Sequence, residues 1–406
     1  MGLVVQKFGG TSVATPERIR EVAAHIVATR RAGNDVVVVV SAMGATTNDL
    51  EKLAFDVVAN PSAREMDMLL TAGERISMAL LCMAIIDQGE EAVSFTGSQA
   101  GILTDTDHMR ARILEVRANR IREALEDGVI AVVAGFQGVS TNSDITTLGR
   151  GGSDTTAVAL AAALKAEFCE IYTDVDGVFT ADPRLVVNAR RLDRLSYEEM
   201  LDLSATGGRV LALRSVEFAR NYAVPVHVRS SFTWKPGTWI REEGMSMEQA
   251  IISGVTHDDS EAKVTVVGVP DRPGIAATVF RALADAQVNV DMIVQNVSTQ
   301  GHTDISFTVP SDNLANARSV IERLVKDVEA AGFSSDENVG RVSLVGAGMK
   351  TNPGVAATMF ETLANAGVNI EMISTSSIRI SCVVAAGDLE KAVLVLHEAF
   401  ALDESP

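Results

Sequence analysis

Apolar runs alternate with helical patterns through the first 240 or so residues of the chain. Residues 3–7 and 35–40 are short and almost continuously apolar, which is typical of strands buried on both faces in a parallel sheet. Between them, apolar residues recur at helical spacing after Thr15 and Pro16, an N-cap followed by proline at the first helical position. This succession of strand, helix and strand predicts a three-layer α/β domain.

The same alternation predicts further elements downstream. Ser196 and Glu199 have the spacing of a capping box, so a helix is expected to begin there. A long apolar helix is expected from Thr71 to about Gln88. Further strands are expected at residues 92–95, 130–136, 170–173 and 224–228.

Beyond residue 245 the chain repeats itself. Segment 264–268 matches 342–346, and segment 273–280 matches 353–360, with many identities in register and only a short change in length. Each copy has the pattern βαββα, as in a small ferredoxin-like module.

The second copy ends near residue 402 and leaves no room for a fourth strand, whereas a spare apolar segment, 251–255, precedes the first copy. We expect this strand to complete the second module, so that the first module is inserted within it. The polar stretch 242–248 marks the domain boundary. The predicted domains are residues 1–245, residues 264–338, and residues 249–262 together with 340–406.

Charge limits the possible partners. The formal net charge is −18, with 53 acidic against 35 basic residues. Nucleic acids and anionic membranes favour a basic protein face, so neither is expected as a partner. An anionic substrate would have to be held by a local cluster of positive groups.

The cysteines and the N-terminal residues indicate the compartment. Cys82, Cys169 and Cys382 lie singly in apolar segments, which fits neither a disulfide framework nor a zinc site. We expect buried thiols in a reducing compartment. The first ten residues have no charged leader or long apolar core, and no apolar run approaches the ~18 residues that span a bilayer. A soluble, cytoplasmic protein is predicted.

A glycine-rich turn, 149–154, lies between an apolar strand and an alanine-rich helix. It contains Arg150, Ser153 and Asp154. Glycines let the backbone approach a ligand, and a helix N-terminus beside an arginine attracts anions. The alternative is a tight turn in which Ser153 is the N-cap and Asp154 lies favourably in the first helical turn. The turn by itself leaves both interpretations open.

A second glycine turn, Gly9 and Gly10, follows Lys7 at the carboxyl end of the first predicted strand. Open α/β sheets bind ligands at that edge. Two cation-bearing glycine turns suit phosphoryl transfer, in which the protein positions reactants and stabilises charge. The alternative for Lys7 is a strand-end lysine in solvent.

The six histidines lie on helix faces, in loops or in the C-terminal half, and none has a convincing catalytic setting. This pattern favours a carboxylate as the phosphoryl acceptor, because a carboxylate with a pKa of about 4 needs no general base at pH 7.

Short motifs recur along the whole chain: KFGGTS at 7–12, SAM at 41–43, TAGER at 71–75, FTGSQAG at 95–101, GRGGSD at 149–154, YTDVDG at 172–177 and DPR at 182–184, followed by the two C-terminal repeats. With these motifs the chain resembles the aspartate kinase family over essentially its whole length. The resemblance implies an amino-acid kinase (carbamate kinase-like) domain followed by two ferredoxin-like βαββαβ ACT domains, to which the two repeats correspond.

The resemblance implies a reaction. ATP and L-aspartate would give ADP and 4-phospho-L-aspartate with Mg²⁺, held mainly by the nucleotide. This is the first step of lysine, threonine and methionine biosynthesis. Lys7 would stabilise the transferring phosphoryl group, with Gly9 and Gly10 offering N–H groups and Asp154 nearby. Glu74 would bind the substrate ammonium and Arg150 its α-carboxylate. The implied substrate contacts are Thr47, Glu74, Arg150, Gly151 and Ser153.

The nucleotide site implied by the resemblance gathers residues from both glycine turns and a later loop: Lys7, Gly9, Gly10, Ser41, Thr173, Asp174, Phe179, Asp182, Arg184 and Arg209. Arg209 stands where the family often has lysine, so its contact stays open. Glu74 has an alternative as a helix-start acid, and residues 173–184 have one as an ordinary polar turn.

ACT pairs in this family bind lysine, threonine or both and inhibit the kinase. The effector positions implied here are Asp271, Asn289, Val290, Asp291, Gln295, Asn296, Met372, Ile373, Arg379 and Ile380. A purely structural module is the alternative. An oligomer through the ACT domains is expected. It would be a homodimer, or an α₂β₂ assembly with a small subunit started at Met245 or Met247.

Two other functions are open. One is a kinase of another acidic amino acid, such as glutamate or N-acetylglutamate, against which the TAGER motif and the ACT pair count. The other is a catalytically inactive sensor that only binds effector, against which the presence of Lys7, Glu74, Arg150 and Asp154 counts.

Overall fold

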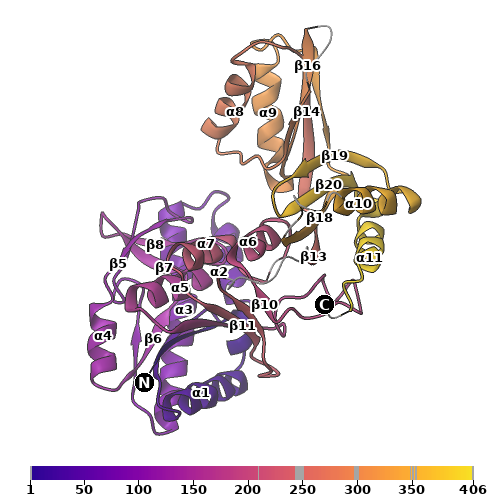
Figure 1. Ribbon diagram of the computed structural model, residues 1–406. Helices are drawn as coiled ribbons and strands as arrows, with labels where there is room; N and C mark the ends of the chain where they lie inside the picture. Colours follow the sequence, from indigo (N-terminus) through magenta and orange to yellow (C-terminus); the bar gives the residue numbers. More distant parts are fainter. Residues whose placement is uncertain are drawn as a thin grey trace. The chain divides into compact units, whose positions relative to one another are not determined.

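The protein forms two compact units in a computed structural model (Figure 1). The structure describes residues 2–208, 210–242, 251–296, 301–347, 349, 352 and 354–404. The first unit comprises Met1–Val178, Arg191–Ser204 and Arg209–Met245, and the second comprises Phe179–Arg190, Ala205–Gly208 and Ser246–Pro406.

An eight-stranded sheet is the centre of the first unit, with strand order β10-β12-β11-β9-β1-β2-β6-β3. Neighbours from β11 to β3 are parallel, and β12 runs antiparallel to β11. Their carboxyl ends therefore meet at one edge of the sheet. The strands are β1 (Leu3–Phe8), β2 (Asp35–Val40), β3 (Ala92–Phe95), β6 (Ile130–Ala134), β9 (Phe168–Thr173), β10 (Arg194–Leu195), β11 (Val226–Ser230) and β12 (Thr238–Ile240).

Helices cover both faces of this sheet. On one face, α1 (Pro16–Arg31) and α3 (Ala63–Asp87) pack in an apolar cluster with Val36, Val38 and Val40 of β2. On the other, α5 (Gly152–Leu164) contacts β1, β2 and β9 and packs against α7 (Leu213–Asn221). The remaining helices of the unit are α2 (Thr46–Val57), α4 (Asn119–Glu126) and α6 (Tyr197–Ala205). The predicted three-layer α/β architecture is confirmed.

Helix α3 begins earlier than predicted, at Ala63 instead of Thr71. The TAGER motif therefore lies in the middle of a 25-residue helix. Gly73 is tolerated there because the helix passes close to the loop after β2: a Cβ on Gly73 would lie 2.7 Å from the Ala42 Cβ. Helix α2 occupies a region whose start, residues 46–47, was expected to be loop.

Among the described helices, α3 alone is long and apolar enough to cross a membrane by length and composition. Half of its most apolar window is buried inside the protein, as in the core helix of a soluble protein, so this is weak grounds for a membrane span.

A small sheet that the sequence did not predict lies beside the main one, in the order β5-β4-β7-β8. Its strands are three or four residues long, too short for an apolar alternation to stand out. They are β4 (Ile102–Thr104), β5 (Ile113–Val116), β7 (Gln137–Ser140) and β8 (Ile145–Thr147). Strand β8 leads directly into the glycine turn at 149–152.

The second unit contains two four-stranded sheets, β15-β16-β14-β17 and β13-β18-β20-β19. Strand β13, which the sequence assigned to the second module, pairs antiparallel with β18. The strands are β13 (Ile251–Asp258), β14 (Glu261–Pro270), β15 (Ile293–Gln295), β16 (His302–Pro310), β17 (Gly332–Asp336), β18 (Val339–Ala347), β19 (Ile370–Thr375) and β20 (Arg379–Ala385). The helices are α8 (Ile275–Asp285), α9 (Leu314–Leu324), α10 (Gly354–Asn365) and α11 (Leu389–Ala399).

The division into units differs from a single cut near residue 245, because segments 179–190 and 205–208 belong to the second unit. Ala181 and Val186 lie in the apolar core of the β13–β18 module. The Val255 N–H also donates to the Thr180 carbonyl at 2.7 Å. Burial of these side chains explains why this stretch packs with the C-terminal modules.

Candidate active site

Lys7 and Asp154 form a buried ion pair. Lys7 lies near the carboxyl end of β1 and Asp154 lies in the first turn of α5. The Lys7 Nζ atom is 2.5 Å from Asp154 Oδ1, and both residues are less than a tenth exposed. The interpretation of Lys7 as a solvated strand-end lysine is therefore wrong. Burying a charge is costly unless it is paired, so Asp154 keeps the ammonium group at the sheet edge.

The first glycine turn brings two loops together rather than offering both of its N–H groups. The Gly9 N–H donates to the Tyr172 carbonyl at 3.2 Å, so it is already engaged, contrary to expectation. A Cβ on Gly10 would lie 2.9 Å from the Ala42 carbonyl oxygen. Glycine is therefore needed at position 10 for the close approach of the loop that follows β2.

The second glycine turn opens α5. Its N-cap is Gly151, which has a left-handed φ of 70°, and no side chain caps the helix. The interpretation of Ser153 as N-cap is wrong, because Ser153 lies within the first turn. Arg150 is exposed beside this uncapped N-terminus. A helix N-terminus without a side-chain cap, next to an arginine, is suited to an anion.

Strand β6 approaches the same helix. A Cβ on Gly135, just after β6, would lie 2.7 Å from Ser153 Oγ. The absence of a side chain at this position lets the start of α5 lie directly over the sheet edge. Ser153 and Asp154 thus lie at the ends of the central strands, together with Lys7.

Glu74 is a buried carboxylate with an unused oxygen. It lies in the middle of α3, which rules out its interpretation as a helix-start acid. Its Oε1 accepts the Ala42 N–H at 3.2 Å, while Oε2 is buried and has no hydrogen-bond partner within the described part of the chain. Burial raises the pKa of Glu74 to about 7. An unused carboxylate oxygen of this kind suits a substrate ammonium group.

Glu170, a second buried glutamate in the same unit, is a carboxylate with a structural role. Burial acts to raise the pKa of Glu170, but hydrogen bonds outweigh it and lower that pKa to about 2. The groups responsible are His227, Gln6, Tyr172 and Arg229. Glu170 is thus fully satisfied by the fold, whereas Glu74 is not, which singles out Glu74 as a functional candidate.

Two further predicted residues, Ser41 and Thr47, lie after β2 and at the start of α2. Ser41 follows β2 and donates its N–H to the Phe8 carbonyl at 3.1 Å, while its own carbonyl accepts the Ser77 hydroxyl at 2.7 Å. Thr47 lies half-buried in the first turn of α2.

The predicted nucleotide residues are divided between the units. Thr173 ends β9 and its hydroxyl donates to the exposed Asp174 at 3.1 Å. Phe179, Asp182 and Arg184 belong to the second unit. There the Arg184 side chain bonds the Asp182 carboxylate and lowers the pKa of Asp182. Arg209 lies outside the described residues.

Ser12 and Ser231, to which the sequence assigned no role, form a pair at the sheet edge. Ser231 follows β11, its N–H donates to the Thr173 carbonyl at 3.0 Å, and its hydroxyl donates to Ser12 Oγ at 2.8 Å. The available signal was the polar Ser230–Ser231 pair at the end of an apolar strand, where ligands bind in parallel sheets.

The predicted effector residues fall into two groups. On the first module, Asp271, Asn289, Asp291, Gln295 and Asn296 are exposed, and Val290 is half-buried. On the second module, Ile373 is exposed and Arg379 is half-buried, whereas Met372 and Ile380 are buried in apolar clusters. Met372 and Ile380 thus contribute to the apolar packing of the second unit.

Asp291 is not a free carboxylate, because it forms an ion pair with Arg341 of β18. Arg341 is itself buried and also meets Glu261 at 2.8 Å and Asp258 at 3.7 Å. This pairing links the two modules of the second unit through charged groups.

Comparisons with known proteins extend over the whole chain. The amino acid kinase family model matches residues 2–230, and the ACT domain model matches residues 264–324 and 342–400. The aspartokinase of Mycolicibacterium smegmatis is 60% identical over 407 residues, covering 99% of this chain and 97% of the relative.

Solved structures agree with this match. E. coli aspartokinase III in complex with aspartate and ADP (R-state) superposes with a TM-score of 0.85 at 26% identity, covering 98% of this chain and 99% of that one. The same enzyme in complex with lysine and aspartate (T-state) gives a TM-score of 0.74 at 25% identity, over 98% of this chain and 99% of that one.

Proposed function

The chain belongs to the aspartate kinase family, and from this premise we propose that it transfers the γ-phosphoryl group of ATP to the side-chain carboxylate of L-aspartate. A carboxylate oxygen of aspartate would attack the γ-phosphorus, the bond to the β-phosphate oxygen would break, and ADP and 4-phospho-L-aspartate would form. The observation that carries this proposal is the buried, half-satisfied carboxylate of Glu74 at the same sheet edge as the Lys7–Asp154 pair.

The amino-acid substrate is held by opposite charges at its two ends. Glu74 Oε2 accepts hydrogen bonds from the substrate ammonium, which supplies the missing partner of that oxygen. Arg150 pairs with the α-carboxylate as a planar fork, next to Gly151 and Ser153 at the uncapped start of α5. Thr47 contributes a hydroxyl from α2.

Lys7 acts on the transferring phosphoryl group. Its ammonium, held by Asp154, stabilises negative charge that develops on the equatorial oxygens. Gly10 and Ser41 flank the phosphates, while the Gly9 N–H remains bonded to Tyr172. Within the first unit, the other proposed nucleotide contacts are Thr173 and Asp174.

Mg²⁺ would be held mainly by the nucleotide. Among the described residues, no cluster of three or more histidine, cysteine, aspartate or glutamate side chains could hold a metal ion. Mg²⁺ is usually bound in proteins by one or two carboxylates together with substrate phosphates. It would neutralise phosphate charge here, and the residues of the chain would supply orientation.

No general base is required. The acceptor carboxylate has a pKa of about 4 in water, so it is already ionised at neutral pH. Catalysis then rests on bringing two anions together, which in a chain of net charge −18 calls for local cations such as Lys7 and Arg150.

The ACT modules place this activity under feedback control by lysine, threonine or both. These effectors are end products of the pathway to lysine, threonine and methionine, in which formation of 4-phospho-L-aspartate is the first step. Support comes from the E. coli relative in complex with lysine. We further propose a cytoplasmic oligomer, either a homodimer through the ACT domains or an α₂β₂ assembly. The candidate internal starts, Met245 and Met247, lie outside the described residues.

A coupled ADP-release assay tests the substrate. L-aspartate is expected to support turnover, and glutamate and N-acetylglutamate are not. Turnover with either of the latter at the rate seen with aspartate would replace the proposal with a kinase of another acidic amino acid.

A further inference from the structure

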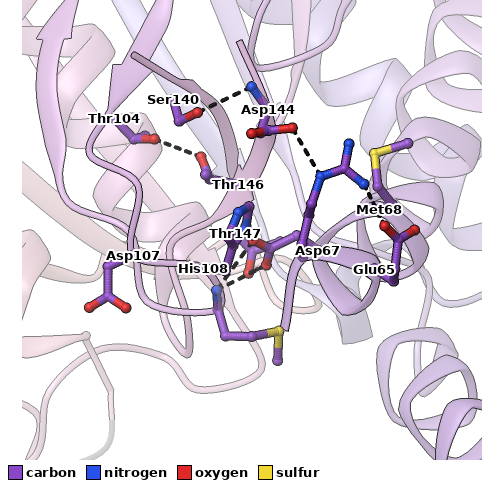
Figure 2. A network of polar contacts seen from close by, with 12 residues as sticks. Glu65, Asp67, Met68, Thr104, Asp107, His108, Ser140, Asp144, Thr146 and Thr147 are labelled. Carbon is purple, nitrogen blue, oxygen red and sulfur yellow. Dashed lines mark hydrogen bonds and ion pairs between the residues drawn. The ribbon is translucent and has the colours of Figure 1, made fainter. Parts of the chain in front are cut away.

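Asp67 is a fully buried carboxylate that joins three segments of the first unit (Figure 2). Its Oδ1 accepts the Thr147 hydroxyl at 2.6 Å and the Met109 N–H at 3.0 Å. Its Oδ2 lies 2.5 Å from His108 Nδ1. Neither Asp67 nor His108 belongs to a motif that the sequence singled out.

The three segments meet beneath the glycine turn. Asp67 belongs to α3, His108 and Met109 belong to the loop between β4 and β5, and Thr147 is the last residue of β8. A Cβ on Gly149 would lie 3.1 Å from the Met109 carbonyl oxygen, so the loop supports the turn directly. The Ala111 N–H also donates to the Thr147 carbonyl at 2.9 Å.

Helix α3 connects this cluster to Glu74. Residues seven apart lie on the same face of a helix, about 10 Å apart along its axis. Asp67 and Glu74 have this spacing and are both buried. One rigid helix therefore carries the carboxylate aimed at the substrate ammonium and the carboxylate that anchors the turn bearing Arg150.

We propose that Asp67 is a positioning residue, which through Thr147 and His108 fixes the Arg150 turn at the correct distance from Glu74. The inference rests on the proposed function, because it assigns these two groups to the two ends of one amino acid. The ammonium and α-carboxylate of that substrate leave from a single carbon atom. Their binding groups must consequently keep a fixed separation, and small displacements cost affinity.

The chain offers a matched pair of variants. Thr146 and Thr147 are adjacent on β8 and both are fully buried. The Thr146 hydroxyl bonds the Thr104 hydroxyl at 2.7 Å, and the Thr147 hydroxyl donates to Asp67 at 2.6 Å. Figure 2 shows the two bonds leading to different segments. Thr147→Val removes the bond to Asp67, Thr147→Ser keeps a hydroxyl there, and Thr146→Val removes the bond that does not reach Asp67.

The experiment measures KM for aspartate, KM for ATP and kcat, together with Tm. Thr147→Val is expected to raise KM for aspartate by about 10- to 100-fold, with KM for ATP within about twofold of its original value. Thr147→Ser is expected to restore most of the loss. Thr146→Val is expected to lower Tm comparably and to leave KM for aspartate unchanged.

His108→Gln provides a second variant that is safe for folding, since His108 is partly exposed. A rise in KM for aspartate alone is expected here also. Equal rises in both KM values, or the same effect in Thr146→Val and Thr147→Val, would overturn the positioning role while the aspartate kinase activity of the unaltered protein stands. Failure of the unaltered protein to turn over aspartate would instead overturn the proposed function.

Discussion

Replacing Glu74 with glutamine isolates the charge of the buried carboxylate. The amide has nearly the same shape, and its oxygen can still accept the Ala42 N–H that Oε1 accepts at 3.2 Å. What disappears is the ability to present a negative oxygen to the substrate ammonium. The variant therefore separates recognition of charge from packing of α3.

The free-energy cost of ionising Glu74 follows from the shift in its pKa. Burial raises the pKa of Glu74 from 4.5 to about 7, and each pKa unit corresponds to about 1.4 kcal/mol, so ionising the side chain in the empty site costs about 3 kcal/mol. A carboxyl whose pKa is raised on folding favours the folded state fully below its unfolded value and loses that contribution as pH rises toward 7. We expect Glu74→Gln to be more stable than the unaltered protein above pH 7, by up to about 3 kcal/mol.

Substrate binding has the opposite requirement, because the ammonium needs the ionised carboxylate. Below pH 7, binding must first remove a proton from Glu74, so KM for aspartate is expected to rise about tenfold per pH unit on the acid side and to level off above pH 7. Aspartate itself does not titrate between about pH 5.5 and 8.

The assay is ADP release at saturating ATP from pH 5.5 to 8, with KM for ATP as the control for nucleotide ionisation. In Glu74→Gln, KM for aspartate should be high and nearly independent of pH. A pH dependence of KM for aspartate that persists unchanged in Glu74→Gln would refute the reasoning. A Tm of Glu74→Gln below that of the unaltered protein above pH 7 would also refute it.

Three further predictions concern other charged groups. Lys7→Ala should abolish turnover while leaving lysine or threonine binding intact in calorimetry; turnover near the original rate would contradict its role. Arg150→Lys should raise KM for aspartate about tenfold or more, because lysine cannot form the planar fork, with KM for ATP little changed. Arg341→Met should destabilise the second unit by about 3–5 kcal/mol at pH 8, since it leaves the buried carboxylate of Glu261 without its cation. The loss in Tm should be smaller at pH 5.5, because burial raises the pKa of Glu261 to about 7 and protonation then removes its charge; an equal loss at both pH values would contradict this.

Local patterns predicted the central strands and the modular repeat well. The continuous apolar run of β2 and the capping box at Ser196, whose N–H donates to Glu199 at 2.9 Å, have strong local signals. Helix α3 was predicted to begin at Thr71, which is too late, because the polar residues of its first turns hide its start. Gly73 lies within the helix, where it serves a close helix–loop contact.

Much of the candidate site could not be predicted from local patterns. The strands of the small sheet are too short to give a periodicity, so the support beneath the Arg150 turn stayed hidden. The Lys7–Asp154 pair joins residues from β1 and α5 that only the sheet order brings together. Likewise, the unused oxygen of Glu74 is visible only once every neighbouring donor has been placed.

The most direct test of the account is to identify the phosphorylated product. The protein is incubated with ATP, Mg²⁺ and L-aspartate, and the acyl phosphate is trapped with hydroxylamine and quantified alongside ADP. The account predicts one aspartyl hydroxamate per ADP, none with L-glutamate, and none from Lys7→Ala. ADP released without hydroxamate, or hydroxamate formed undiminished by Lys7→Ala, would contradict it.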